Sequence, residues 1–322
     1  DYLRMLNMGL PEITRFIGDT YYRAEIDEHG TSFSGIDLVE VALSWNLAKE
    51  YQKIRDLMPG ELREFTTSYL RRWDIQNVVT ILRGKMQNER PGKIKEILVP
   101  AGKLDKAVLD RLLAEESPER VVEALKGEAI YPTLERELPG AIETGSFAHL
   151  ENELYKGYYA QLIADAQAGV KGGKMFLKYI ELEIDIRNIQ NLFRLQAGRV
   201  HEDVRELMIP GGSFSIEDLQ RLSGIEDRDE LIDALKERVK EIPLLDVLEA
   251  IRDKKFLHEI EVALTRVQLD LMERMSKRYP FSVLPVLAYL EEKKYEVANL
   301  RALARGRKAN IPGERLRSYL VI

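Results

Sequence analysis

The stretch Asp74-Ile75-Gln76-Asn77, followed by Arg83, decides the fold because it occurs three times. Asp185-Ile186-Arg187-Asn188 is followed by Arg194, and Glu296-Val297-Ala298-Asn299 is followed by Arg305. The three stretches begin at positions 74, 185 and 296, so the two intervals are equal and no gap is needed within any stretch. The nine repeated positions are Asp74, Asn77, Arg83, Asp185, Asn188, Arg194, Glu296, Asn299 and Arg305. Three polar columns at one spacing predict an internal triplication.

Apolar residues and turn residues repeat with these polar columns. Ile75, Ile186 and Val297 align, and so do further apolar positions on both sides. A proline-containing turn follows each stretch, as Val99-Pro100-Ala101-Gly102, Ile209-Pro210-Gly211-Gly212 and Ile311-Pro312-Gly313-Glu314. The sequence therefore predicts three helical repeats, at residues 1–105, 106–214 and 215–322.

Each repeat has the pattern of helices and turns. In the first, Leu43, Leu47 and Tyr51 recur at steps of four and predict a long helix over about residues 36–58. A second helix is predicted over 61–85, with counterparts at 174–196 and 282–305. Sustained polar and apolar alternation is missing, and so are the Asn-Gly and Asp-Gly turns of hairpins. The predicted fold class is all-α, with three tandem helical bundles.

Composition excludes several classes of protein. The chain has no cysteine, which rules out disulfides, thiolate metal sites and cysteine nucleophiles. A net charge of −6 disfavours nucleic-acid binding, which normally needs a basic excess. No stretch approaches the roughly 20 apolar residues that cross a bilayer, so any membrane contact is expected to run through a partner.

Candidate chemical sites are weak. Residues 168–175 have the glycines and the lysine of a phosphate-binding loop, but Ala168 and Met175 stand where that motif needs Gly and Ser or Thr. None of the histidines follows a glutamate by three residues, as a di-metal helical bundle would require. These histidines are His29, His149, His201 and His258. The acidic run that begins at Asp227 is interpreted as a helix start, not a calcium loop. We expect no metal, no cofactor and no catalytic residue.

The nine repeated polar residues leave two interpretations open. On a helix the acid and the asparagine lie about 60° apart, whereas the arginine lies about 180° from the acid, so one trio cannot converge on a substrate. Buried Asp and Asn would satisfy backbone groups, and the arginines would cap nearby carbonyl groups. The alternative is a contact with a partner that occurs three times.

A basic stretch near the end of the sequence is also open to two interpretations. It is either a solvated helix face or a docking site for an acidic partner or anionic lipid headgroups. Its members are Arg301, Arg305, Arg307, Lys308, Arg315 and Arg317.

The segment 69–77, Tyr-Leu-Arg-Arg-Trp-Asp-Ile-Gln-Asn, together with Leu82-Arg83-Gly84-Lys85, resembles the C subunit of archaeal-type (A/V-type) ATP synthases. The d subunit of the vacuolar ATPase is the eukaryotic relative in that family. The opening Asp1-Tyr2-Leu3 and Leu10-Pro11-Glu12-Ile13 are similar as well, and the resemblance extends over essentially the whole chain. The chain starts where some preceding family residues are expected, so part of the first repeat is expected to be missing.

The resemblance implies a funnel of three bundles around a pseudo-threefold axis. Its wide opening would receive the central shaft made by the D and F subunits, and its other face would sit on the cytoplasmic side of the membrane c-ring. Such a subunit transmits torque, binds no nucleotide and is not an enzyme. Two rival interpretations remain: a free-standing helical-repeat scaffold or adaptor for soluble partners, and a helical enzyme with its site between repeats.

Overall fold

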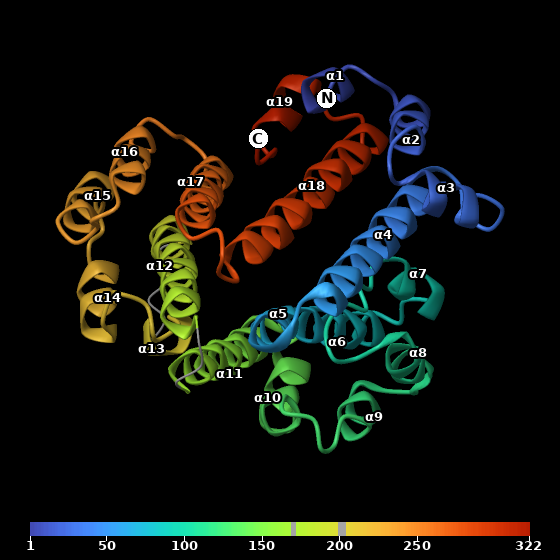
Figure 1. Cartoon of the computed structure of the whole chain (residues 1–322), viewed down its shortest axis with the longest axis horizontal. Helices are drawn as coiled ribbons and strands as arrows, with labels where there is room; N and C mark the ends of the chain where they lie inside the picture. The colour runs from blue at the N-terminus through green and yellow to red at the C-terminus, as the bar shows by residue number, and fades with distance from the viewer. Residues whose placement is uncertain (169–171, 199–203) are drawn as a thin grey trace. The chain divides into compact units, whose positions relative to one another are not determined.

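The protein is built from α-helices, as the repeated helical pattern predicts. A computed structural model describes residues 1–168, 172–198 and 204–322, and no β-strand occurs within these ranges (Figure 1). The helices are α1 (Tyr2–Met5), α2 (Leu10–Gly18), α3 (Arg23–His29), α4 (Gly35–Leu57), α5 (Gly60–Leu70), α6 (Arg72–Met86), α7 (Pro91–Glu96), α8 (Lys106–Ala114), α9 (Pro118–Glu123), α10 (Tyr131–Thr144), α11 (Ala148–Gln167), α12 (Gly173–Gly198), α13 (Val204–Leu207), α14 (Ile216–Ser223), α15 (Arg228–Lys236), α16 (Ile242–Ala250), α17 (Leu257–Arg278), α18 (Leu284–Lys308) and α19 (Gly313–Arg317).

Packing divides the chain into two units. Unit 1 contains residues 1–154 and 292–320, and unit 2 contains residues 155–291 and 321–322. The last part of α18 and all of α19 therefore pack with the beginning of the chain and not with the residues that precede them. The two units are defined by packing and do not test the three repeats that the sequence predicts. The repeat boundaries at 105/106 and 214/215 therefore remain a prediction.

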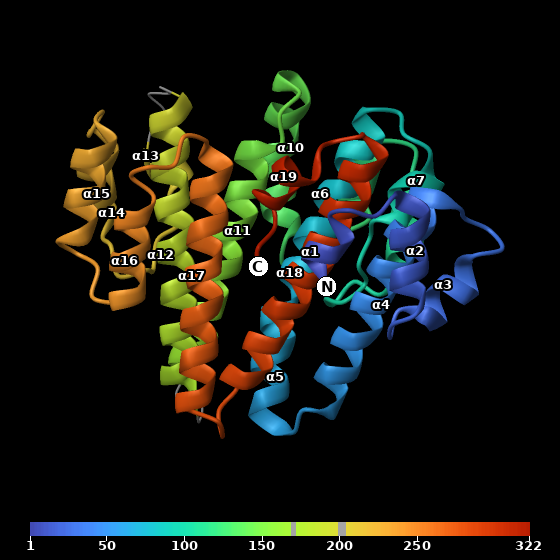
Figure 2. The same cartoon turned by 90° about the horizontal axis from the view of Figure 1, so that it is seen from above.

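Unit 1 is organised around α4. This helix packs against α2, α3, α5 and α7, and the predicted face of Leu43, Leu47 and Tyr51 is fully buried there. The C-terminal half of α18 runs alongside α4 (Figure 1), and Arg301 and Arg305 contact Ser44 and Glu40 across this pair. Figure 2 shows the same helices from above. Near the ends of the chain, a Cβ atom on Gly313 would lie 2.8 Å from the backbone oxygen of Leu6, so the first residue of α19 touches the segment after α1.

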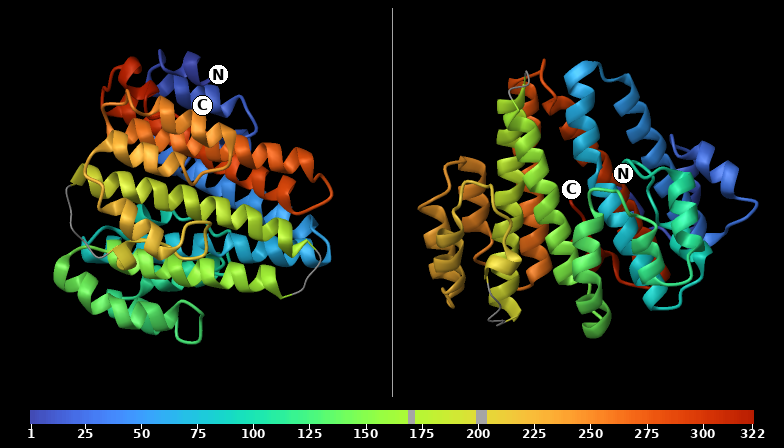
Figure 3. Two further views of the ribbon diagram at one scale, coloured as in Figure 1. Left: turned by 90° about the vertical axis from the view of Figure 1, so that its left-hand side faces the viewer. Right: turned by 90° about the horizontal axis from the view of Figure 1, so that it is seen from below.

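Unit 2 is organised around α12 and α17, which lie side by side (Figure 3). Their facing sides contribute Ile186 and Phe193 from α12, and Leu264 from α17, to one apolar cluster. The short helices α13 to α16 cover this pair, and α15 and α16 add Leu231 and Leu248 to the same cluster. Burial of these aliphatic and aromatic side chains is the main stabilising term in such a bundle.

The predicted helix bounds agree with α4, α12 and α18 to within three residues. The helix predicted over 61–85 differs, because the structure forms two helices, α5 and α6, with a turn at Arg71. Arg71 keeps helical dihedral angles (φ −58°, ψ −17°), and its amide hydrogen-bonds to Ser68 O at 3.3 Å. The Asp74 amide in turn bonds to Arg71 O at 3.0 Å, so the connection is one tightened turn. A periodicity argument cannot detect it, because the apolar positions continue on both sides.

The first and third repeats end their repeated helix in the same way. Asn88 and Asn310 stand at equivalent positions of these two repeats, and both adopt the left-handed conformation, at φ 52° and 56°. The next amide, from Glu89 or Ile311, returns to the carbonyl of Gly84 or Gly306 at 2.8 Å in each case. These glycines allow the following chain to pack closely, since a Cβ atom would lie 2.4 Å from Ile94 Cδ1 at Gly84 and 2.1 Å from Leu316 Cδ2 at Gly306.

We expect Gly84→Ala and Gly306→Ala to destabilise the protein by about 1–2 kcal/mol each, because the added methyl group overpacks the core by more than helix propensity returns. The control is Gly157→Ala in α11, where nothing lies within 4 Å of the added atom. It should raise stability by about 0.5–1 kcal/mol. Chemical denaturation measures all three, and equal effects at the three sites would contradict this packing argument.

Candidate functional site

The three repeated arginines each pair with a glutamate. Arg83 lies 2.7 Å from Glu151 and Arg194 lies 2.6 Å from Glu261. The guanidinium Nε of Arg305 donates to the Glu40 carboxylate. The arginines therefore meet carboxylates, and not the helix-end carbonyl groups that the sequence analysis expects.

The three glutamates form a repeated column of their own. Glu40 on α4, Glu151 on α11 and Glu261 on α17 stand at nearly equal intervals along the chain. Each arginine on the repeated helix of one predicted repeat pairs with the long helix of the next repeat, and Arg305 of the third repeat pairs with Glu40 of the first. This column was missed by sequence analysis although its spacing was visible, because a lone glutamate on a helix is most often a solvated residue.

The repeated Asn and Asp of the first two repeats hold the proline-containing turn. Asn77 Nδ2 donates to Val99 O at 2.7 Å, and Asn77 Oδ1 accepts from Val99 N at 2.8 Å. The second repeat has the same pair, in which Asn188 bonds to Ile209 O and Ile209 N at 2.8 and 2.9 Å. Each amide side chain thus satisfies both polar groups of one buried backbone residue.

The aspartates bind the same turns a few residues further on. Asp74 accepts from the amides of Lys103 and Leu104 at 2.9 and 2.8 Å. Asp185 accepts from the amide and the hydroxyl of Ser213 at 2.8 and 2.6 Å. Each aspartate approaches its turn so closely that only glycine fits beside it. A Cβ atom on Gly102 would lie 2.2 Å from the Asp74 carboxylate, and one on Gly212 would lie 2.1 Å from that of Asp185.

The pKa values of these two aspartates are shifted in the same direction. Burial raises the pKa of Asp74 to about 6, and the backbone hydrogen bonds only partly oppose the shift. Burial likewise raises the pKa of Asp185 to about 6, against the hydrogen bonds from Ser213 and the Phe214 amide. The loss of hydration therefore exceeds the gain from hydrogen bonding at both sites.

The third repeat uses its acid and asparagine differently. Glu296 accepts hydrogen bonds from the hydroxyls of Tyr21 and Tyr22, and Lys293 Nζ lies 3.2 Å from its carboxylate. Burial and the neighbouring Glu296 carboxylate raise the pKa of both tyrosines well above their usual value. Asn299 is buried, and its side chain hydrogen-bonds to Tyr2. The third set thus joins α18 to the first helices of the chain.

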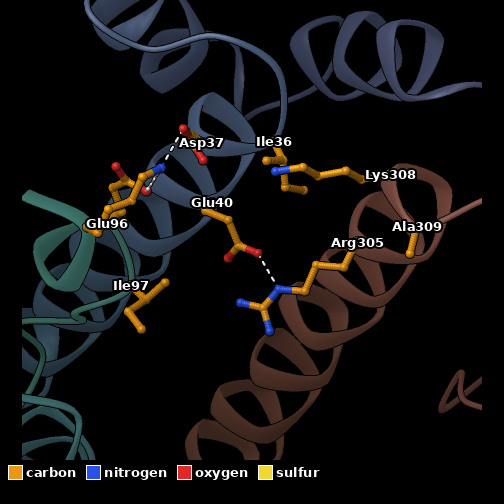
Figure 4. Close-up of a pocket in the computed structure, with 9 residues that line it drawn as sticks. Ile36, Asp37, Glu40, Glu96, Ile97, Arg305, Lys308 and Ala309 are labelled. Carbon is orange, nitrogen blue, oxygen red and sulfur yellow. Dashed lines mark hydrogen bonds and ion pairs between the residues drawn. The ribbon is translucent and has the colours of Figure 1, made fainter. Parts of the chain in front are cut away.

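The Glu40 carboxylate pairs with two guanidinium groups, that of Arg305, which Figure 4 shows, and that of Arg301. Arg301 Nε is 3.0 Å from Glu40 Oε2, and Arg301 also donates to Ser44 Oγ at 2.6 Å. Glu40 is 5% exposed, and burial lowers the pKa of the Arg301 guanidinium although Glu40 opposes this shift. This cluster is the candidate functional site, because buried charges that join distant segments are costly unless all partners stay in place.

The remaining sequence candidates lie apart from this cluster. His149 pairs with Glu137 at 3.1 Å, His29 contacts the rings of Phe33 and Trp45, and His258 stacks on Phe256. His201 and residues 169–171 of the glycine-rich segment lie outside the described residues. Asp227 caps α15 by accepting from the amides of Asp229 and Glu230, which confirms the predicted helix start.

The described residues contain neither a metal-binding cluster nor a membrane-spanning helix. Within residues 1–168, 172–198 and 204–322, no three His, Asp or Glu side chains are grouped so as to hold a metal ion. In the same ranges, none of the helices is both long enough and apolar enough to cross a membrane.

Comparison with known proteins gives one consistent result. The family model for the ATP synthase (C/AC39) subunit matches residues 1–319. An A-type ATP synthase C subunit from Methanococcoides burtonii is 36% identical over 324 residues, which cover all of this chain and 88% of the relative. The protein of that name from Archaeoglobus fulgidus is 34% identical and covered to 91%, and that from Haloferax volcanii is 32% identical and covered to 92%.

We expect Glu40→Gln to destabilise the protein by about 3 kcal/mol, because it leaves the buried Arg301 guanidinium without its counter-charge. The matched control is Glu151→Gln, whose partner Arg83 is 47% exposed in its side chain and which should cost less than about 1 kcal/mol. Urea denaturation of both variants measures the difference, and similar losses would show that burial of the Glu40 cluster carries no energetic weight.

The raised pKa of Asp185 predicts a pH dependence. The folded state holds this proton more tightly than the unfolded chain, so the contribution to stability is full below pH 4 and is lost as the pH rises to about 6. Relative to Asp185→Asn, wild type should lose about 3 kcal/mol of unfolding free energy between pH 4 and pH 7. Ser213→Ala removes one donor to the carboxylate and should move the upper end of this window to higher pH. A constant difference across the range would contradict the shift.

Proposed function

The chain belongs to the ATP synthase (C/AC39) subunit family, and from this premise we propose that it acts as the C subunit of an A-type ATP synthase. Its role there is that of a non-catalytic rotor subunit in the central stalk. It links the shaft made by the D and F subunits to the c-ring in the membrane. It transmits the torque that couples ATP synthesis or hydrolysis to ion translocation. The observation that carries this proposal is the family match over nearly the whole chain.

The pattern of ion pairs supports a closed arrangement of the three repeats. Each predicted repeat offers an arginine to the long helix of the next, and the third repeat offers Arg305 to Glu40 of the first. Three repeats that are linked head to tail in this way form a closed ring of contacts, which is the connectivity of a pseudo-threefold funnel. The nine repeated polar residues then have a structural role. The arginines join neighbouring repeats, Asn and Asp of the first two repeats hold turns, and Glu296 and Asn299 of the third join α18 to the start of the chain.

A torque-transmitting part must resist relative movement of its repeats. The second and third junctions each have two polar contacts one helical turn apart. Arg194 contacts Glu261 and Gln190 contacts Thr265, while Arg305 contacts Glu40 and Arg301 contacts Ser44. Two contacts at different heights on a pair of helices oppose both sliding and rotation, which a single contact does not. This stiffness is what the rotor role requires.

The location follows from the proposed partners. We place the protein on the cytoplasmic face of the membrane, held there peripherally by its contact with the c-ring. The competing proposal is a helical-repeat scaffold that works free of any ATPase and would bind neither the shaft nor the ring.

We expect the purified chain to bind a purified D–F subcomplex and, separately, the isolated c-ring in detergent, and to hydrolyse no ATP alone. Pull-down with tagged chain measures both interactions, and a heat-unfolded sample controls for non-specific adhesion. If the chain is folded by circular dichroism and binds neither component, the rotor assignment is wrong and the scaffold is favoured. Binding to the D–F subcomplex alone would reject the linking role.

A further inference from the structure

A cleft of about 550 Å³ opens beside the Glu40 cluster, at the C-terminal end of α18. Figure 4 shows Arg305, Lys308 and Ala309 on one side of it, and Ile36, Asp37, Glu96 and Ile97 on the other. All of these residues belong to unit 1. The cleft therefore combines charged groups of both signs with aliphatic surface.

The carboxylates in this cleft already have cationic partners. Lys93 lies 2.5 Å from Asp37 and 3.2 Å from Glu96. Glu40 pairs with Arg301 and Arg305. The acidic side of the cleft thus has no carboxylate left for an incoming cation.

The basic side does have free donors. Arg305 binds Glu40 through Nε alone, and its terminal nitrogens have no hydrogen-bond partner among the described residues (Figure 4). Lys308 is exposed and, in the same part of the chain, forms no ion pair or hydrogen bond. Arg305 and Lys308 stand three residues apart on α18 and both line the cleft, and cationic groups that present N–H donors are suited to a carboxylate.

Comparison among the repeats shows that helix packing does not require a charge at the position of Lys308. The positions equivalent to Lys308 in the first and second repeats are Met86 and Ala197. The position equivalent to Arg301 in the second repeat is Gln190, which contacts Thr265 at the same kind of helix junction without any charge. Lys308 therefore has no basic counterpart in the first two repeats, and it makes no ion pair among the described residues that would help to close the junction.

The local charge balance indicates an acidic partner. The segment 301–317 contains six basic residues and one acidic residue, Glu314, in a chain whose net charge is −6. A flat anionic membrane would also approach Asp37 and Glu96 on the opposite wall, which repel it. A protein segment can instead place one carboxylate beside Lys308 and apolar atoms against Ile36 and Ile97, and Ile97 is 38% exposed.

We propose that this cleft binds a segment of a partner protein in which an acidic side chain stands next to an aliphatic one. The carboxylate accepts hydrogen bonds from the terminal nitrogens of Arg305 and from Lys308, and the aliphatic side chain packs on Ile36 and Ile97. Arg301 stays with Glu40, so the helix junction remains closed while the segment binds.

The test is a titration of the isolated full chain, labelled at isoleucine δ1 methyl groups, with the peptide acetyl-Leu-Glu-Leu-amide. We expect saturable shifts at Ile36 and Ile97 that weaken as salt is added. The peptide acetyl-Leu-Gln-Leu-amide, which lacks the charge, should give none. Because no ATPase component is present, the result is independent of the proposed rotor function.

Lys308→Glu should weaken the peptide about tenfold, since one charge contact of about 1.4 kcal/mol is reversed. Lys255→Glu is the matched control, an exposed lysine in unit 2, and should bind as wild type does. Melting temperatures establish that both variants are folded. Equal binding by Lys308→Glu and wild type overturns the proposal. So does the absence of peptide binding in a chain that binds vesicles of anionic lipid.

Discussion

The structure of unit 1 depends on one buried carboxylate held between two guanidinium groups. Glu40, Arg301 and Arg305 come from opposite ends of the chain, with 265 residues between Glu40 and Arg305. Burial makes such charges unfavourable unless they are paired, so the cluster tolerates only the arrangement in which α18 lies against α4. The surrounding apolar residues supply most of the stabilising energy, while the charges select which helix face and which register are used.

The predicted triplication accounts for the composition of this cluster. The arginine and glutamate columns recur at all three junctions, but only the third brings a second arginine and a buried glutamate. The first two junctions join repeats that are already connected along the chain. The third joins the last predicted repeat to the first without a direct chain connection, so it has the larger entropic cost of bringing distant segments together. The second arginine and the buried glutamate give that junction stronger contacts, which offset the entropic cost.

The same logic applies inside the repeats. In the first two, Asn and Asp satisfy the backbone of the turn that follows, and the adjacent glycine gives the carboxylate room. In the third, the acid is Glu296, whose longer side chain reaches the hydroxyls of Tyr21 and Tyr22. The same repeated position therefore holds a turn in the first two repeats, and in the third it joins α18 to the start of the chain. A rotor adaptor of the kind proposed needs both rigid repeats and a closed set of repeats.

The sequence by itself determined the helical class, the repeat spacing and the residues that recur, because these are periodic and each helix is formed by neighbouring residues. It also located the turns that Asn77 and Asn188 hold, although not the hydrogen bonds. Only the tertiary structure decided what the arginines contact, since their carboxylates lie 68, 67 and 265 residues away. It alone showed that α5 and α6 are separate and that α18 ends in unit 1. Such pairings form when helices that are distant in the sequence pack together. A local pattern of residues does not specify which of these helices will become neighbours in the folded protein.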